Sequence, residues 1–338
     1  MEDKKKNETR QSTMQNRMEN MNRQKPKTIS IVISVYNEEK ALHEFYQEAT
    51  PVFEALPWNY ELIFVNDGSA DASGQILAEL AAADPRVRVI NFSRNFGHEA
   101  AMLAGLDHSS GEGIVCMDAD LQHPPECVAQ IIEKFEEGYE VINMVRTKNK
   151  SAGFIKNLTS SAFYKFLNKI SDVKLENNAS DFFALTANAA QVLKTNYREK
   201  VRFLRGYVQN IGFNRTTIEY EARARVAGES KYSIRKLFKF SINTILCFSD
   251  LPLKLGIYSG IIVGFLGLLV MLETIYEWAV KGTPNGYATI VVLLCFMFAM
   301  LFVIVGIIGE YIAILFTELK DRPIYIVHDT KGFPEKES

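Results

Sequence analysis

Two carboxylates separated by one residue, Asp118 and Asp120, are the residues best suited to chemistry, and Gln122 follows them closely. They come directly after residues 113–117, a short apolar run that predicts a buried strand. Carboxylate and amide oxygens are ligands that Mg²⁺ and Mn²⁺ accept, and these ions share their remaining positions with substrate phosphates. A single acidic pair is a weak signal because acidic turns are common, but its place after a buried strand strengthens the prediction of a metal site.

Two further polar clusters also follow predicted strands: Tyr36-Asn37-Glu38 after residues 28–34, and Asn66-Asp67-Gly68 after residues 60–65. Asp67 could form a simple Asx-turn or accept hydrogen bonds from a base or ribose. Glu38 could be an acid stabilised at a helix N-terminus or a nucleotide contact. The residue pattern leaves both pairs of alternatives open.

Strands and helices alternate along residues 28–145, with a strand about every 30 residues, which is typical of βαβ units in a parallel, doubly wound sheet. The predicted strands are 28–34, 60–65, 87–91, 113–117 and 140–145, and the predicted helices are 38–56, 71–83, 96–109 and 124–137. Such sheets bind ligands at the carboxyl ends of their strands. The α/β fold therefore gathers the three polar clusters at one edge of a mostly parallel sheet.

The last third of the chain holds two long apolar runs, residues 255–280 and 287–316, and each is long enough to cross a hydrocarbon core of about 30 Å. Lys and Arg flank the outer ends of this hairpin (Arg235, Lys236, Lys239, Lys254, Lys320 and Arg322), whereas the link between the runs has only Lys281. The positive-inside rule then predicts that both termini and the catalytic domain are cytoplasmic.

Five segments are expected: a disordered polar tail (1–27), a catalytic domain (28–229), amphipathic interface helices (230–254), a transmembrane hairpin (255–316) and a cytoplasmic tail (317–338). Residues 233–248 place their apolar side chains on one helical face, which fits a helix lying on the bilayer and equally an ordinary surface helix. The net charge of −2 argues against a nucleic-acid-binding protein. The four cysteines lack C-x-x-C spacing, which argues against a zinc site.

Five motifs stand in the order found in family 2 glycosyltransferases: Val35-Tyr36-Asn37-Glu38-Glu39, Val65-Asn66-Asp67-Gly68-Ser69, Ser93-Arg94-Asn95-Phe96-Gly97, Asp118-Ala119-Asp120-Leu121-Gln122, and Arg225-Val226-Ala227-Gly228-Glu229-Ser230-Lys231-Tyr232. Residues 306–312 and Arg322-Pro323 add a closer resemblance to polyprenyl-phosphate (bactoprenol) glucosyltransferases, which are relatives of dolichyl-phosphate mannose synthase. The resemblance runs from Ile29 to Val327.

This resemblance implies a Rossmann-like, GT-A type domain that transfers one sugar, glucose or an N-acetylhexosamine, from a UDP-sugar to undecaprenyl or another polyprenyl phosphate with inversion. It implies a bound Mg²⁺ or Mn²⁺ held by Asp118, Asp120 and Gln122. The implied donor contacts are Tyr36, Glu38, Asp67, Asp118, Gln122, Arg205, Arg225, Lys231 and Tyr232. Asp120 and Asp181 are the implied catalytic residues, with Asp181 at the acceptor side as a base or an orienting group. Arg146 and Lys156 would hold the acceptor phosphate.

The chain departs from the family pattern at two positions. Phe183 stands where the family usually has Arg, and His123 stands where many members have Asp. A lone His beside Pro is more often a surface residue than a ligand, so we expect His123 at the surface. Glu310 lies inside the second apolar run, where a carboxylate is costly and often functional.

Two other function classes compete with the transferase. A processive polysaccharide synthase is disfavoured because two spans are few for a channel and no Q-x-x-R-W motif is present. A non-catalytic adaptor for a flippase is disfavoured because every acidic cluster is present. The expected setting is a bacterial cell membrane, with a homo-oligomer, a downstream flippase and a membrane glycosyltransferase as partners, and a lipid-linked sugar for the cell envelope as product.

Overall fold

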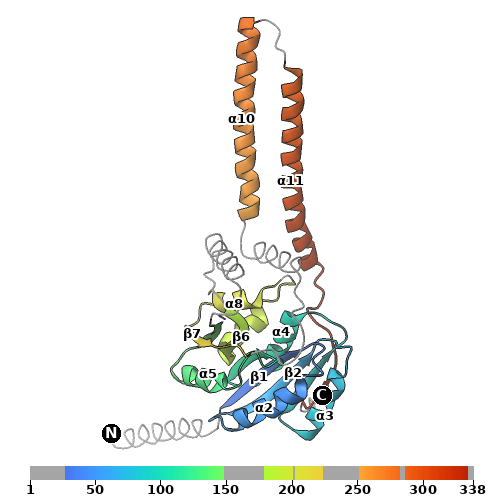
Figure 1. Cartoon of the computed structure of the whole chain (residues 1–338), viewed down its shortest axis with the longest axis vertical. Helices are drawn as coiled ribbons and strands as arrows, with labels where there is room; N and C mark the ends of the chain where they lie inside the picture. The colour runs from blue at the N-terminus through green and yellow to red at the C-terminus, as the bar shows by residue number, and fades with distance from the viewer. Residues whose placement is uncertain (1–26, 148–178, 201, 224–250, 282–285, 334–338) are drawn as a thin grey trace, which may run out of the picture.

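The computed structural model describes residues 27–147, 179–200, 202–223, 251–281 and 286–333. These residues form an α/β domain around one sheet, and two long helices project from the domain (Figure 1). The amphipathic segment expected at 230–254 lies mostly outside the described residues, and so does the polar tail expected at 1–27.

The sheet has eight strands in the order β7-β5-β6-β4-β1-β2-β3-β8. Their bounds are β1 (Thr28–Val35), β2 (Asn59–Asn66), β3 (Val87–Phe92), β4 (Gly113–Asp118), β5 (Val141–Arg146), β6 (Ala179–Thr186), β7 (Arg215–Tyr220) and β8 (Val327–Lys331). The strands β1 to β4 are parallel, β5 is parallel to β7, and β6 and β8 are antiparallel to their neighbours. The predicted α/β fold with a mostly parallel sheet is confirmed.

Helices cover both faces of the sheet, so the central strands are buried on both sides. One face carries α2 (Leu42–Glu54), α3 (Ser73–Ala83) and α5 (Cys127–Glu136), whose side chains share a core cluster. The other carries α4 (His98–His108), α7 (Ala187–Asn196) and α8 (Leu204–Asn210), with a second cluster. Gly105 lets α4 lie directly on Val32 of β1, since a Cβ there would overlap the valine side chain.

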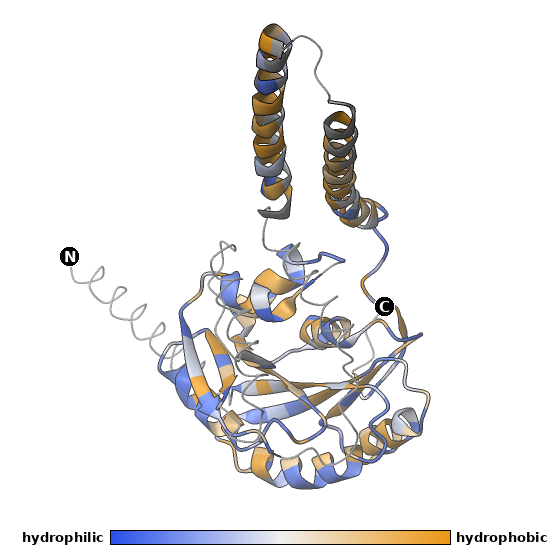
Figure 2. Ribbon diagram, turned by 45° about the horizontal axis from the view of Figure 1, so that its top comes forward, coloured by the Kyte–Doolittle hydropathy of each residue, from blue (hydrophilic) through white to orange (hydrophobic). Residues whose placement is uncertain are grey.

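The two projecting helices are α10 (Leu251–Lys281) and α11 (Tyr287–Leu319). Each contains a long apolar stretch, Leu253–Val280 and Phe296–Leu319, and neither stretch is buried within the protein. At about 1.5 Å per residue, both are longer than a hydrocarbon core of about 30 Å. They pack side by side, with Gly256 facing Ile304, and their surfaces are mostly apolar (Figure 2). Both are therefore candidate membrane spans.

After α11 the chain returns to the sheet of the α/β domain. Strand β8 pairs antiparallel with β3 and thereby covers an edge that would otherwise expose unpaired backbone groups. The Tyr325 ring stacks on Phe92 at 5.1 Å, and its hydroxyl donates a 2.6 Å hydrogen bond to Asp107. The segment 317–338, which we expected as a tail, thus includes a strand of this sheet and anchors the end of α11 to the domain.

Candidate active site

The loops that follow β1 and β2 bind each other. The Asn37 N–H donates to Ser69 Oγ at 3.0 Å, and the Ala70 N–H donates to Asn37 Oδ1 at 2.8 Å. The Glu38 N–H donates to Ser73 Oγ at 3.0 Å. Asn37 has a positive φ of 56°, which Asn tolerates better than most residues. These contacts fix the predicted donor residues Glu38 and Tyr36 at the strand end, where Tyr36 is exposed.

Asp67 organises the loop that leads into α4. Its carboxylate accepts hydrogen bonds from the backbone N–H groups of Phe96 (2.6 Å) and Gly97 (2.9 Å) and from Asn95 Nδ2 (2.9 Å). The side chain is buried, and burial raises its pKa although the two backbone donors oppose this shift. In the structure the Asp67 carboxylate therefore shapes the loop 94–97, and a nucleoside contact would have to coexist with these bonds.

The predicted metal residues occupy a tight turn after β4. Asp118 is one-third exposed, and its carboxylate lies 3.4 Å from Ser34 Oγ at the end of β1. Asp120 is buried and accepts a 3.1 Å hydrogen bond from the Gln122 N–H. Leu121, which follows Asp120, has a positive φ of 58°, which is uncommon for a residue with this side chain. The turn thus holds one open and one buried carboxylate close together.

His123 is buried under this turn, so the expectation of a surface histidine was wrong. Its Nδ1 accepts a 3.0 Å hydrogen bond from the Asp118 N–H, and its ring stacks on Phe182 at 4.9 Å. Burial lowers its pKa although Asp118 opposes the shift, so the ring is neutral and Nδ1 is free to accept. The sequence did not reveal this role because Phe182 and its neighbour Tyr220 come from β6 and β7, which were not predicted.

The antiparallel strand β6 brings Asp181 to the same point. Cys116 pairs with Phe183; Asp118 comes two residues after Cys116 and Asp181 two residues before Phe183, so in this antiparallel pair the two carboxylates lie at adjacent strand ends. Arg205 binds the Asp181 carboxylate through Nη2 (2.8 Å) and Nε (3.1 Å). Burial opposes ionisation, but Arg205 and then His98 outweigh it and lower the pKa of Asp181 to about 2. Arg205, which the resemblance assigned to the donor diphosphate, here pairs with the aspartate that the resemblance placed at the acceptor side.

His98, the first residue of α4, was not among the predicted site residues and lies between the two carboxylates. Its Nδ1 is 2.8 Å from Ser34 Oγ and 3.7 Å from Asp118 Oδ1, and its Nε2 is 3.9 Å from Asp181 Oδ2. Burial lowers its pKa, but Asp118 and Asp181 raise it more, and the net shift is upward. Nε2 is buried and has no hydrogen-bond partner among the described residues. Its position directly after the motif Ser93–Gly97 was the available signal.

Glu99 follows His98 and was also missed. Its Oε1 accepts a 3.2 Å hydrogen bond from the Leu204 N–H, which ties α4 to the start of α8. Burial and the nearby Asp181 raise its pKa to about 7. A carboxyl group with so shifted a pKa next to Asp181 is a candidate for a functional role.

Arg146, at the end of β5, reaches over the turn. Its Nη2 lies 3.4 Å from Gln122 Oε1, and its Nε lies 3.4 Å from the Tyr220 hydroxyl. Arg146, which was predicted to hold the acceptor phosphate, thus lies next to the predicted metal residues.

Phe183 is buried in the core and provides no charge at its position. The predicted residues Lys156, Arg225, Lys231 and Tyr232 lie outside the described residues.

Comparison with known proteins identifies the family. The model of glycosyl transferase family 2 matches residues 30–191. An uncharacterized glycosyltransferase of Bacillus subtilis (strain 168) is 43% identical over 308 residues, which cover 91% of this chain and 95% of the relative. The SfII prophage-derived bactoprenol glucosyl transferase of Shigella flexneri is 36% identical over 300 residues, 88% of this chain and 97% of the relative. The chain is a family 2 glycosyltransferase.

Among solved structures, this glycosyltransferase is similar to glucosyl-3-phosphoglycerate synthase from Mycobacterium tuberculosis in complex with Mn²⁺, UDP-glucose and phosphoglyceric acid. The TM-score is 0.46 at 18% identity, and the match covers 65% of this chain and 78% of that one.

The carboxylates of the glycosyltransferase fit a divalent cation that arrives with a phosphate ligand. Within the described residues, no group of three or more His, Cys, Asp or Glu side chains forms a complete metal cage. Asp118 keeps its carboxylate partly exposed, and Asp120 stands two residues away in the same turn. One or two carboxylates completed by substrate phosphates is the usual binding mode of Mg²⁺. The residues present therefore fit the ion that the sequence predicted.

Proposed function

We propose that the protein transfers one glucose or N-acetylhexosamine unit from a UDP-sugar to polyprenyl phosphate, with inversion, at the cytoplasmic face of a bacterial membrane. The observation that supports this most is the meeting of Asp118 with Asp181 and its partner Arg205 at one strand end. The domain that holds this site continues into two candidate membrane spans. The relative from Shigella flexneri named bactoprenol glucosyl transferase supports a lipid acceptor.

On the donor side, the loops after β1 and β2 bind the nucleoside, with Tyr36 exposed for stacking. Asp118, Asp120 and Gln122 would hold Mg²⁺ or Mn²⁺, which neutralises negative charge on the departing diphosphate. Arg225, Lys231 and Tyr232 complete the proposed donor contacts.

On the acceptor side, the phosphate is already ionised near neutral pH, so it needs positioning rather than deprotonation. Asp181 suits this task because its low pKa makes it a weak base but a permanent anion. It holds Arg205 in place, and that guanidinium, with Arg146 and Lys156, would orient the phosphate. A phosphate oxygen then attacks the anomeric carbon as the bond to the UDP oxygen breaks on the opposite face, which inverts the configuration and releases UDP.

The orientation in the membrane follows from the charge distribution around the spans. New cysteines at Asn285 in the hairpin link and at Ser338 should differ in their labelling by a membrane-impermeant reagent in intact cells. We expect labelling at Asn285, and labelling of Ser338 from outside would contradict the orientation and the access to cytoplasmic nucleotide sugars.

The activity itself is tested by UDP release from the full-length protein in neutral-lipid nanodiscs. We expect release from one member of a UDP-sugar panel, dependent on added undecaprenyl phosphate and on Mg²⁺ or Mn²⁺. Asp120→Ala should abolish it, and Glu133→Ala, exposed on α5, should not. A polymeric product would indicate a processive synthase. Absence of release with every donor would indicate a non-catalytic adaptor.

A further inference from the structure

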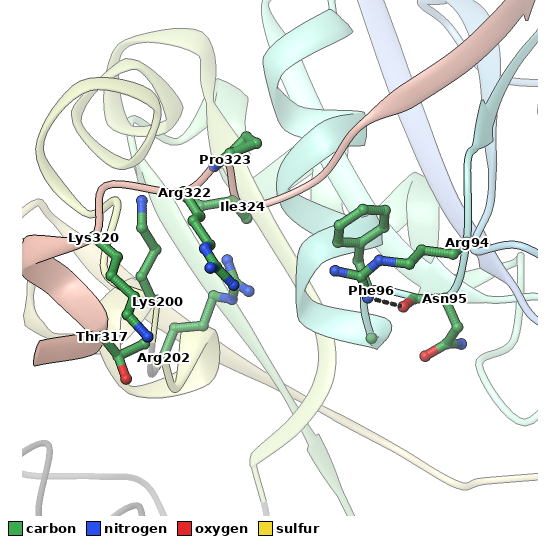
Figure 3. Close-up of a pocket in the computed structure, with 11 residues that line it drawn as sticks. Arg94, Asn95, Phe96, Lys200, Arg202, Thr317, Lys320, Arg322, Pro323 and Ile324 are labelled. Carbon is green, nitrogen blue, oxygen red and sulfur yellow. Dashed lines mark hydrogen bonds between the residues drawn. The ribbon is translucent and has the colours of Figure 1, made fainter. Parts of the chain in front are cut away.

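A basic pocket of about 450 Å³ lies where the catalytic domain meets the end of α11. Five of its lining residues are cationic: Arg94, Lys200, Arg202, Lys320 and Arg322. None of the described residues that line the pocket is acidic. Figure 3 shows Lys200, Arg202, Lys320 and Arg322 on one side and Arg94 with Phe96 on the other. The catalytic mechanism above does not use any of these five side chains.

Arg202 carries the clearest sign of a missing ligand. Its Nη1 is buried and has no hydrogen-bond partner among the described residues. Burial lowers the pKa of Arg202, although Glu99 and Glu318 oppose that shift. A buried cationic donor without an acceptor is costly, and a phosphate oxygen is an acceptor that suits guanidinium geometry.

Three acids stand near the pocket, Glu99, Glu318 and Asp321, against five cations in its lining. Glu318 accepts a 2.6 Å hydrogen bond from the backbone N–H of Lys200, and with Glu99 it acts electrostatically on Arg202. Asp321 lies 3.5 Å from Lys200 Nζ, but its side chain is 96% exposed and the pair is therefore weak. Arg94 and Lys320 lie against aromatic rings, over Phe96 at 4.0 Å and Phe316 at 4.2 Å, which hold the cations without neutralising them.

With α11 as a membrane span, the pocket lies at the depth of lipid headgroups. Thr317 and Lys320 stand at the end of α11, and the apolar stretch of that helix ends at Leu319. Polar headgroups begin where the hydrocarbon core ends. Gly97, which also lines the pocket, directly precedes His98, so the pocket borders the catalytic residues.

We propose that this pocket binds the phosphate group of a membrane lipid, with Arg94, Lys200 and Arg202 contributed by the catalytic domain and Lys320 and Arg322 by the foot of the second span. The site needs both parts of the chain, which strand β8 holds together. The same phosphate chemistry has two sources, the acceptor polyprenyl phosphate or an anionic phospholipid of the bilayer. The first source rests on the proposed function, and the second does not.

The test uses the full-length protein in nanodiscs with an Arg202→Gln/Arg322→Gln double variant. Arg322→Gln alone serves as a second variant, because this side chain is exposed and its loss leaves the fold intact. Lys254→Gln is the matched control, since it removes an exposed cation from the same membrane boundary but outside the pocket. Native mass spectrometry measures retained phosphatidylglycerol, and UDP release measures the apparent KM for undecaprenyl phosphate in phosphatidylcholine.

Loss of charge-assisted contacts should change one of the two measured quantities, retained phosphatidylglycerol or the KM for undecaprenyl phosphate, roughly tenfold in the double variant. The change should be smaller in Arg322→Gln and absent in Lys254→Gln. A tenfold higher KM in phosphatidylcholine, with unchanged kcat, identifies the acceptor as the ligand. A tenfold loss of retained phosphatidylglycerol, with unchanged KM, identifies the phospholipid. Wild-type retention and wild-type KM in both variants would overturn the proposal, as would equal losses in Lys254→Gln. Failure of the proposed function is distinguishable, because the wild type itself would then release no UDP.

Discussion

Replacement of Gly68 by alanine tests how the loop after β2 packs against the loop 94–97. Gly68 follows Asp67 in the loop after β2 and has a positive φ of 65°. A Cβ at this position would overlap the carbonyl carbon of Arg94 and lie 2.6 Å from the Asn95 nitrogen. Gly212 provides a matched control, because its φ is 78° and a Cβ there would meet nothing within 4 Å. Gly212→Ala therefore measures the backbone strain alone, and Gly68→Ala measures strain plus overlap.

The expected magnitudes follow from these contacts. Backbone strain at positive φ costs an alanine about 1 kcal/mol in both variants. To restore an ordinary contact of 3.4 Å, the loop at Asn95 must move by 3.4 − 2.6 = 0.8 Å. Such a shift breaks the hydrogen bonds of 2.6 Å and 2.9 Å from Phe96 and Gly97 to the buried Asp67 carboxylate. Two charge-assisted bonds contribute about 3 kcal/mol or more, so Gly68→Ala should cost about 4 kcal/mol in total.

The assay is thermal unfolding of the full-length protein in detergent, combined with the KM for the UDP-sugar. A cost of 1 kcal/mol corresponds to about 2–4 °C in a domain of this size. Gly212→Ala should therefore lower the melting temperature by about 3 °C and leave KM unchanged, whereas Gly68→Ala should lower it by about 10 °C and raise KM. Equal melting temperatures for the two variants would refute the role of Gly68 in allowing the close approach of loop 94–97.

Three further predictions concern residues of the candidate site. His98→Asn should lower kcat about tenfold to a hundredfold with little change in melting temperature, because it removes the group between Asp118 and Asp181; unchanged steady-state kinetics would contradict this role. Asp181→Asn should lower kcat at nearly constant UDP affinity, whereas Arg146→Ala should mainly raise the KM for polyprenyl phosphate; weaker UDP binding by Asp181→Asn would move this residue to the donor side. Glu99→Gln should alter the pH dependence of stability. Burial raises the pKa of Glu99 from 4.5 to about 7. The folded state therefore keeps the carboxyl proton to a higher pH than the unfolded state. As pH rises from 4.5 to 7, the free energy of unfolding of the wild type should fall by up to about 3 kcal/mol. The variant should lack this part of the decline in melting temperature, and an unchanged profile would refute the buried position of the carboxyl.

The alternation of strands and helices over residues 28–145 determined the first five strands and the position of the polar clusters. Buried strands such as 29–35 are rich in β-branched apolar residues, and the chain marks their ends with Asn, Asp and Gly, so local pattern suffices to find them. The two apolar helices were equally evident because an uninterrupted apolar run of about 20 residues is typical of a membrane span. Helix starts were less accurate: α2 begins at Leu42 rather than 38, since Asn37 to Glu39 bind the neighbouring loop instead of entering the helix.

Only the tertiary structure decided which residues complete the site. Strand β6 pairs antiparallel with β4 and brings Asp181 to Asp118 from a distant part of the sequence, and no local pattern records that pairing. The buried position of His123 depends on rings from β6 and β7, and the place of His98 depends on α4 lying against β1. The basic pocket joins Arg94 to Arg322 because β8 returns to β3. Sequence determines the types and local order of the groups, but contacts between distant segments set their distances, burial and charge partners, and those quantities decide what each group can do.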